Sequence, residues 1–483
     1  MVARTLFDPA PHTGHDDRPR HGTTVKISDV FDNGGRFEAS AFGIDRRNAV
    51  AAVEAGGFVS LYGEGGLAYE AHNAFRFARV YVEPEHGVPF LTSADIIAFT
   101  PGTDRFLSRT KTDRLDELLV RHWDVLISCS GTVGNVALAG ERIAGMALSQ
   151  DAIRVRFEEP HLAGFVSGFL RSRFGRPQLT GAAYGSAVWH IEPHHLENVA
   201  VPAFDAAVVR SIGEAVMRAT VMRDDANDKL DAADAVLRDQ LGLRQLPRVP
   251  AGSEGFAVRS SALADRFEAA YHTPQATAAQ DALKALPYPV ATLGDPKVTE
   301  EVRAITRFRK RVYVPTGGIP MLNSRQLFQI DPIRRKSIAK GATRADIIDE
   351  IRLQPDMICV TCSGTIGRVQ IVPRYMAEWT ASQDAMRIVA NEPGYVYAWL
   401  ASEYGQALLQ RHTYGSLIPH IDLDQLASVP VPLPPAEIRA EVGALVTAAN
   451  ELRDIAWRTE QKAIAEIEAR VEAAGAGLKS AAA

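Results

Sequence analysis

Apolar residues recur at helical spacing along two long stretches of this chain. In the first stretch, from about Ala206 to Leu243, they follow one another at steps of three, four and six residues. These positions are Val208, Ile212, Val216, Met222, Ala226, Leu230, Ala233, Leu237 and Leu241. No proline interrupts them, so the pattern predicts one amphipathic helix of ~37 residues, roughly 55 Å long at 1.5 Å per residue. The stretch from about Pro435 to Ala474 repeats the pattern 230 residues later and predicts a second long helix.

Shorter apolar segments, separated by glycine and proline, fill most of the remaining chain. Val125–Ser128 and Ile153–Val155 have the length and composition of buried strands, whereas Leu162–Phe174 has helical spacing. Sequence of the same kind returns after a linker rich in proline and glycine at Leu246–Ser253. The pattern predicts a mixed α/β module before each long helix.

The two modules repeat one another. The motif Ser-Gly-Thr-x-Gly at 130–134 returns at 363–367, and Ser-Gln-Asp-Ala at 149–152 returns at 382–385, each 233 residues later. Tyr-Gly-Ser followed by histidine at 184–190 returns at 414–420, and Arg-Phe-Glu-Ala at 36–39 returns at 266–269, each 230 residues later. A period of about 230 residues is too long for a solenoid repeat and indicates a duplicated domain.

These patterns together predict the fold class: an α+β protein with two duplicated α/β domains separated by a pair of long antiparallel helices, related by a pseudo-two-fold axis. Each helix has one apolar stripe, and the other helix is the obvious partner for it. Antiparallel pairing is expected to hold the modules apart at opposite ends of a rod. The expected layout is a flexible lead-in (1–25), module one (26–204), helix one (205–244), a linker (245–255), module two (256–433), helix two (434–474) and a frayed tail (475–483).

Composition narrows the class of protein. Of the 483 residues, 46% are apolar and 23% charged, which is typical of a globular protein, and no apolar run reaches the length of a membrane span. The polar N-terminus does not have the pattern of a secretory signal, and three cysteines do not make a disulfide framework, so we expect a cytoplasmic location. Cys359 and Cys362 form a C-x-x-C inside an apolar strand with no second pair, which disfavours a metal or redox site.

Charge is segregated along the chain. The net charge of −5 weighs mildly against binding to nucleic acid. Basic residues nevertheless cluster in both modules, for example at 303–311 and 105–114, and acidic residues concentrate on the first long helix at 224–234. This distribution permits a basic cleft on an acidic body, although each cluster is equally compatible with a solvated face.

The repeated motifs contain polar groups but no catalytic signature. Ser-Gly-Thr-x-Gly lacks the lysine and the spacing of a P-loop, so a tight turn after a strand is favoured over a ligand cradle. The Tyr-Gly-Ser motif and its histidine provide an aromatic ring, a hydroxyl and an imidazole, which are suited either to polar recognition or to packing beneath a turn. No nucleophile elbow, zinc-protease motif or dinucleotide fingerprint is present. The chain is therefore not expected to be an enzyme on its own, and no metal site is expected.

The ordered set of motifs resembles the specificity (S) subunits of type I restriction–modification systems, over about Lys26 to Ala474. In the second module the resemblance rests on the segments 266–274, 319–324, 356–367, 382–385, 414–416 and 429–435, and the first module has 88–93 and the later motifs. The first module departs from this pattern at Val201–Phe204, where the proline-rich run is missing, and Ile96–Arg121 has no clear twin. An S-like subunit of a related methylation-linked phage-defence system fits the same motifs.

The resemblance implies a non-catalytic DNA-recognition subunit. Each module would read one half of an asymmetric bipartite site in double-stranded DNA, and the helices would set the distance between halves. The expected partners are methyltransferase subunits, two in number and carrying S-adenosylmethionine, and a translocating restriction subunit; this chain itself is expected to bind no cofactor. The candidate base contacts are Thr92, Ser93, Ser130, Thr132, Tyr184, Ser186 and His190 in module one, and Asn323, Ser324, Arg325, Ser363, Thr365, Tyr414, Ser416 and His420 in module two. The candidate phosphate contacts are Arg105, Lys111, Arg309, Lys310, Arg335 and Lys336.

Two other functions remain open from the sequence. The duplicated modules are compatible with a protein-interaction scaffold of a defence complex that reads no bases, which the acidic balance slightly favours. A single-chain nuclease or methyltransferase is the other alternative, and methyl transfer by the isolated protein would establish it.

Overall fold

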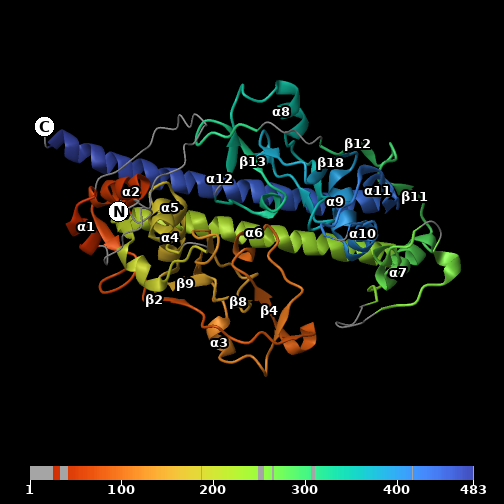
Figure 1. The fold of residues 1–483 in the computed structure, drawn as a ribbon, viewed down its shortest axis with the longest axis horizontal. Helices are drawn as coiled ribbons and strands as arrows, with labels where there is room; N and C mark the ends of the chain where they lie inside the picture. Colours follow the sequence, from red (N-terminus) through yellow and green to blue (C-terminus); the bar gives the residue numbers. More distant parts are fainter. Residues whose placement is uncertain are drawn as a thin grey trace, which may run out of the picture.

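Two long helices form the axis of the molecule. The computed structural model describes residues 25–32, 42–185, 188–247, 255–263, 266–305, 311–333, 335–415 and 417–481. Helices α6 (Ala206–Leu241) and α12 (Ala436–Ala481) lie side by side and run in opposite directions (Figure 1). Near one end Val216 shares a core with Ile467, and near the other end Leu237 shares a core with Val446. The predicted antiparallel helix pair is confirmed.

The ends of the helices differ from the sequence-based expectation. Helix α6 ends at Leu241 because Gly242 adopts a left-handed conformation, with φ of 60°, that closes the C-terminus. Helix α12 continues to Ala481, whereas the sequence analysis expected a frayed tail after 474. The tail is rich in alanine, which has the highest intrinsic helix propensity and so favours continuation of the helix.

The described residues of the first module form three small sheets. Their strand orders are β2-β9-β6-β7, β3-β5-β4-β8 and β1-β10. The strands are β1 (Phe58–Ser60), β2 (Glu70–Asn73), β3 (Tyr81–Val82), β4 (Gly87–Leu91), β5 (Phe106–Ser108), β6 (Val125–Ser128), β7 (Val136–Leu138), β8 (Ala147–Leu148), β9 (Ala152–Arg156) and β10 (Ala200–Pro202). The α-helices are α1 (Ile27–Asp32), α2 (Ile44–Glu54), α3 (Leu115–Leu118), α4 (Pro160–Arg171) and α5 (Arg176–Ala182), and the short 3-10 helices include η3 (Asp95–Ile97) and η4 (Pro193–Asn198).

The second module repeats this topology. Its sheets have the orders β12-β18-β15-β16, β14-β13-β17 and β11-β19. The strands are β11 (Val290–Thr292), β12 (Thr299–Arg303), β13 (Ile319–Leu322), β14 (Lys336–Ile338), β15 (Ile358–Thr361), β16 (Val369–Ile371), β17 (Thr380–Ala381), β18 (Ala385–Ala390) and β19 (Pro430–Pro432). The helices are α7 (Pro274–Lys284), α8 (Ala345–Ile351), α9 (Pro393–Ala401), α10 (Glu403–Gln410) and α11 (Leu423–Ala427), with the 3-10 helix η7 (Gln326–Phe328). The duplication is confirmed, although the repeated residues at 36–39 lie outside the described part of the chain.

Each module packs on both long helices. The core of module one includes Ile212 of α6 and Val471 of α12, and the core of module two includes Leu241 of α6 and Val442 of α12. In both copies a glycine pair allows a short helix to approach the long one. A Cβ atom on Gly164 of α4 would lie 2.3 Å from the Gly213 carbonyl oxygen of α6, so this contact requires glycine. The equivalent pair, Gly394 and Gly443, stands in the same relation at 2.5 Å.

The modules also touch each other, contrary to the expectation that the rod holds them apart. The amide of Phe99 donates to the carbonyl of Phe328 at 3.0 Å, and the amide of Ile330 donates to the carbonyl of Ile97 at 2.9 Å. Ala98 and Gln329 form a β-bridge between these bonds. Phe99 is buried in a core cluster made otherwise of module-two side chains. The apolar surface at this point is removed from water only when the modules meet.

This bridge is symmetric. Strands β4 and β13 and the 3-10 helices η3 and η7 align with a shift of 231 residues, which makes Ala98 the counterpart of Gln329. Residues 96–99, the beginning of the stretch that has no clear twin in sequence, therefore have structural counterparts at 327–330. Equivalent residues that pair with each other mark the pseudo-two-fold axis, which passes through this bridge.

Candidate nucleic-acid interface

A groove of about 490 Å³ lies between the two modules beside the bridge. Five predicted DNA contacts line it: Ser93, Ser130 and Thr132 from module one, and Asn323 and Arg325 from module two. Sequence reasoning missed Asn135, Gln326 and Gln329, which also line the groove. Gln329 is part of the bridge between the modules and Gln326 lies three residues before it, so a search for the twin of 95–99 would have drawn attention to both.

The Ser-Gly-Thr-x-Gly motif is a tight turn in both modules. Gly131 and Gly134 have φ of 71° and 95°, which favours glycine at these positions. The Ser128 hydroxyl donates to the carbonyl of Thr132 at 2.5 Å and accepts from the Asn135 amide at 2.9 Å. These two hydrogen bonds join the Ser128 side chain to the backbone of the turn and stabilise it.

The second module uses a threonine in place of that serine. The Thr361 hydroxyl donates to the carbonyl of Thr365 at 2.5 Å and accepts from the Arg368 amide at 3.0 Å. Thr132 and Thr365 are both exposed at the tips of their turns, which leaves their hydroxyl groups open to solvent.

The Tyr-Gly-Ser motif packs beside this turn. Tyr184 and His190 exchange backbone hydrogen bonds of 2.9 and 2.8 Å, and the amide of Gly131 donates to the carbonyl of Trp189 at 3.0 Å. Tyr414 and His420 form the same pair in the second module. Two motifs that are distant in sequence thus form one surface in each module. Ser186 and Ser416 lie outside the described residues.

The two tyrosines differ in their surroundings. The Tyr184 hydroxyl donates to Glu192 at 2.5 Å, and the Tyr184 ring stacks on His195 at a centroid distance of 5.5 Å. Tyr414 has 41% of its surface exposed. The same backbone position therefore presents a partnered ring in one module and a more open one in the other.

Thr92 and Asn323 shape the next turn of each module. The Thr92 hydroxyl donates to the Asp95 carboxylate at 2.7 Å. The backbone amide of Asn323 donates to the side-chain oxygen of Gln326 at 3.2 Å, and the backbone amide of Gln326 donates to the side-chain oxygen of Asn323 at 2.9 Å. Ser93 and Ser324 are half-buried beside them, and Ser363 is half-buried at the turn of module two. Equivalent positions thus have different donors and acceptors in the two modules.

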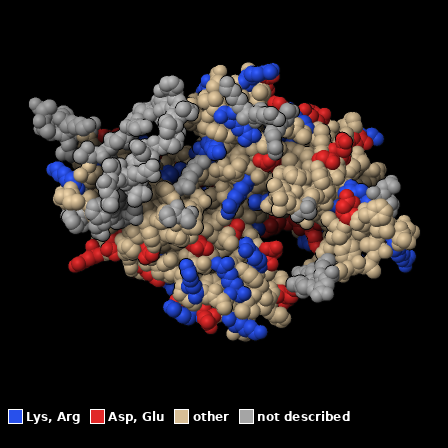
Figure 2. Space-filling model, in the orientation of Figure 1, with Lys and Arg blue, Asp and Glu red and all other residues tan. Residues whose placement is uncertain are grey.

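The predicted phosphate contacts that the structure describes are either exposed or half-buried. Arg105, Lys111 and Lys336 are exposed, and the Lys336 ammonium lies 4.9 Å from the centre of the Tyr313 ring. Arg335 is half-buried, pairs with Asp331 at 3.3 Å and lies over the Trp379 ring. Arg309 and Lys310 lie outside the described residues. Figure 2 shows Lys and Arg gathered over the tip of module one, around β4 and α3, and across the centre of this face.

An arginine–glutamine contact repeats in both modules and was not singled out from the sequence. Arg79 donates to the side-chain oxygen of Gln150 at 3.2 Å, and Arg311 donates to that of Gln383. The two glutamines belong to the Ser-Gln-Asp-Ala repeat. This contact places one cation beside that motif in each copy.

The cysteines are free thiols. Burial raises the pKa of Cys129 to about 12 and that of Cys362 to about 11, which keeps both protonated at neutral pH. Among the described residues, no group of three or more histidine, cysteine, aspartate or glutamate side chains is placed to hold a metal ion. No described helix is both long enough and apolar enough to cross a bilayer.

One family model matches part of this chain. Residues 305–472 match the family model of the type I restriction modification DNA specificity domain. This segment covers most of module two and most of α12, and module one has the same topology. The matched segment therefore belongs to one of the two copies of the same topology in this chain. The predicted resemblance to the specificity subunits of type I restriction–modification systems is confirmed by this family match over residues 305–472.

Three solved structures show similarity along most of the chain. The S subunit of a type I system from M. genitalium is 12% identical, with 86% of this chain and 98% of that chain covered and a TM-score of 0.34. The HsdS subunit from Thermoanaerobacter tengcongensis is 14% identical, with 86% and 97% covered and a TM-score of 0.27. A chain from a study of type I complex assembly and conformational transition is 14% identical, with 84% and 97% covered and a TM-score of 0.27. The comparison with curated proteins finds no match.

Proposed function

We propose that this chain reads an asymmetric bipartite DNA target, with one half-site for each module, and directs partner subunits to it. The observation that carries the proposal is the groove between the modules, because predicted contacts from both copies line it. A protein that reads two half-sites needs two similar surfaces on one face. The bridge at Ala98 and Gln329 brings equivalent turns of the two modules to the same groove.

The chemistry of the exposed groups suits base recognition. Hydroxyl, amide and guanidinium groups distinguish base edges in the major groove, while lysine and arginine contacts to phosphate set register. Thr92 of module one corresponds to Asn323 of module two, and Ala94 corresponds to Arg325. Because equivalent positions carry different groups, the two half-sites are expected to differ in sequence. Two readers on one face favour half-sites about one helical turn apart, roughly 34 Å.

Partner subunits would supply the catalysis. Methyltransferase subunits that carry S-adenosylmethionine, two in number, and a translocating restriction subunit complete the proposal. The acidic side chains of α6, among them the exposed Asp225 and Asp228, suit a protein partner better than a phosphate backbone. This chain would then select the DNA sequence, and its partner subunits would carry out the reaction on it.

Selection from a random duplex library tests the proposal. The full-length chain, alone and with a type I methyltransferase subunit added, should enrich two short sequences separated by a constant spacer. Replacement of Lys336 by alanine should weaken binding to every sequence and reduce the slope of log affinity against log salt by about one. Lys284→Ala is the matched control, because Lys284 is exposed on α7 and pairs with Asp281.

Two results would contradict the proposal. Binding that enriches no sequence, with or without the methyltransferase, would favour the protein-interaction scaffold. Methyl transfer to DNA by the isolated chain with labelled S-adenosylmethionine would establish an enzyme instead.

A further inference from the structure

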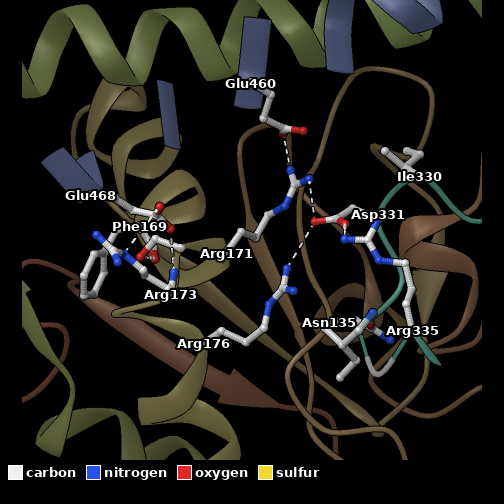
Figure 3. Close-up of polar contacts among 12 residues, drawn as sticks. Asn135, Phe169, Arg171, Arg173, Arg176, Ile330, Asp331, Arg335, Glu460 and Glu468 are labelled. Carbon is white, nitrogen blue, oxygen red and sulfur yellow. Dashed lines mark hydrogen bonds and ion pairs between the residues drawn. The ribbon is translucent and has the colours of Figure 1, made fainter. Parts of the chain in front are cut away.

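A buried ion network joins both modules to both long helices. The Arg171 guanidinium, at the end of α4, lies between Asp331 of module two and Glu460 of α12 (Figure 3). Glu460 also pairs with Arg223 of α6. Asp331 is 3.4 Å from Arg171, 3.1 Å from Arg176 and 3.3 Å from Arg335. Asp331 therefore connects the two modules, and Glu460 connects the network to the helix pair.

Burial makes this network different from a surface ion pair. The side chains of Arg171, Asp331 and Glu460 are only 6%, 8% and 2% exposed. Burial alone raises the pKa of Asp331, but the guanidinium groups of Arg171, Arg176 and Arg335 outweigh it and lower that pKa to about 2. Asp331 is thus ionised at neutral pH and holds three cations at one point.

The network borders the candidate DNA groove. Pro332 and Ile333, which follow Asp331, line that groove, and the amide of Ile333 donates to the side-chain oxygen of Asn135 at 3.5 Å. Arg176 and Arg335 are 27% and 28% exposed, so they form the outer side of the network. A change in the position of Asp331 would therefore shift the groove wall contributed by module two relative to module one.

We propose that Asp331 is a positioning residue that fixes the two modules relative to each other and thereby restricts the range of spacer lengths that the protein accepts between half-sites. This inference rests on the proposed bipartite recognition. The long helices determine where each module is attached, and the Asp331 network determines how the modules are oriented about the bridge. A single base-pair change in spacer rotates one half-site by roughly 36° and moves it by about 3.4 Å, which a rigid pair of readers cannot follow.

The test compares spacer profiles. Once a bipartite target has been selected, affinities are measured for duplexes with the natural spacer and with one or two base pairs added or removed. The wild-type chain should lose at least about tenfold in affinity for each change of one base pair. Asp331→Asn and Arg176→Gln should reduce this loss to about threefold or less, and leave the affinity for each half-site alone unchanged. Asp331→Glu, which keeps the charge, should restore part of the discrimination.

Two controls keep the test decisive. Arg176→Gln leaves Asp331 with two arginines and so protects the fold if Asp331→Asn does not fold. Glu468→Gln removes a partly exposed ion pair between Arg173 of module one and α12 without touching module two, and it should keep the wild-type spacer profile. Spin labels at Asp113→Cys and Glu300→Cys, which are exposed positions on the two modules, should show a broader distance distribution in Arg176→Gln than in the wild type.

The outcomes separate the two proposals. If no bipartite sequence is selected, the proposed function fails. If a target with a sharp spacer preference is selected and Arg176→Gln retains both that preference and a narrow distance distribution, the role of Asp331 is refuted while the proposed function stands.

Discussion

The two sides of the pseudo-two-fold junction have the same backbone and different side chains. On one side, Arg171 is held between Asp331 and Glu460. At the counterparts of these three positions on the other side stand Ala401, Thr100 and Leu230. A cavity of about 270 Å³ lies there, with these same three residues in its lining. The duplication thus gives both sides of the junction the same backbone, and only one side carries the buried ion network. We call the side of Arg171, Asp331 and Glu460 the locked side and the side of Ala401, Thr100 and Leu230 the unlocked side.

The remaining arginine of the unlocked side shows the consequence. Arg453 is the counterpart of Arg223 and is 2% exposed. It donates to the Thr100 hydroxyl at 2.9 Å and to the Asn227 side-chain oxygen at 3.3 Å, and it lies over the Phe99 ring. Within the described part of the chain, its Nε and Nη1 atoms have no hydrogen-bond partner. This side relies on apolar packing and neutral acceptors, whereas the other relies on carboxylates.

The largest effect is expected at the centre of the locked side. Asp331→Asn leaves the guanidinium groups of Arg171, Arg176 and Arg335 without their shared carboxylate, and it should lower the free energy of unfolding by about 3–5 kcal/mol. Urea unfolding of the full-length chain measures this loss. A decrease below about 1 kcal/mol would mean that the network contributes little.

On the unlocked side, Phe99→Ala removes the main apolar contact between the modules. Phe99 is buried among module-two residues and lies 6.5 Å from the Tyr375 ring, so its truncation should cost about 3 kcal/mol. Phe58→Ala is the control, because Phe58 is 49% exposed and should cost far less. Equal losses for the two variants would show that the apolar contact between the modules is not important for stability.

Acid should weaken the locked side selectively. The pKa of Asp331 is lowered to about 2, below its ordinary value of 3.8, so its stabilising effect is present above about pH 4 and disappears as the pH falls toward 2. The difference in unfolding free energy between wild type and Asp331→Asn should shrink by about 2 kcal/mol over that range. A pH-independent difference would contradict this assignment.

A carboxylate can be added to the unlocked side. Thr100→Asp places an acceptor of opposite charge beside the buried Arg453 and should raise the free energy of unfolding by about 1 kcal/mol. The gain should vanish in a background with Arg453→Met. A loss of stability in Thr100→Asp would indicate that the cost of burying the new charge exceeds the attraction.

The smallest effect is expected for a partly exposed pair outside the junction. Glu468→Gln removes the ion pair of Glu468 with Arg173 and keeps an oxygen that can accept from the Arg173 amide, so it should cost about 0.5 kcal/mol. This loss should decrease further in high salt, because solvent and ions screen exposed charges. If Glu468→Gln lowered the free energy of unfolding as much as Asp331→Asn, the buried Asp331 network would not differ in strength from an ordinary ion pair.

The sequence determined the features that depend on local pattern. The periodic apolar stripe predicted both helices, because a helix presents every third or fourth residue to one side. The repeated motifs predicted the duplication and brought Ser130, Thr132, Asn323 and Arg325 forward as site candidates, and the groove brings these four together.

Only the tertiary structure decided how the modules meet. Asp331 and Arg171 are 160 positions apart, and neither belongs to a motif, so no local sequence pattern predicts their contact. Apolar stripes report that a surface is buried but not against what, which is why the insertion of Phe99 into the other module was not foreseen. The asymmetry of the junction was also not predictable from local pattern. The same backbone accepts different side chains at equivalent positions, and burial and three-dimensional geometry set the energy of an ion pair.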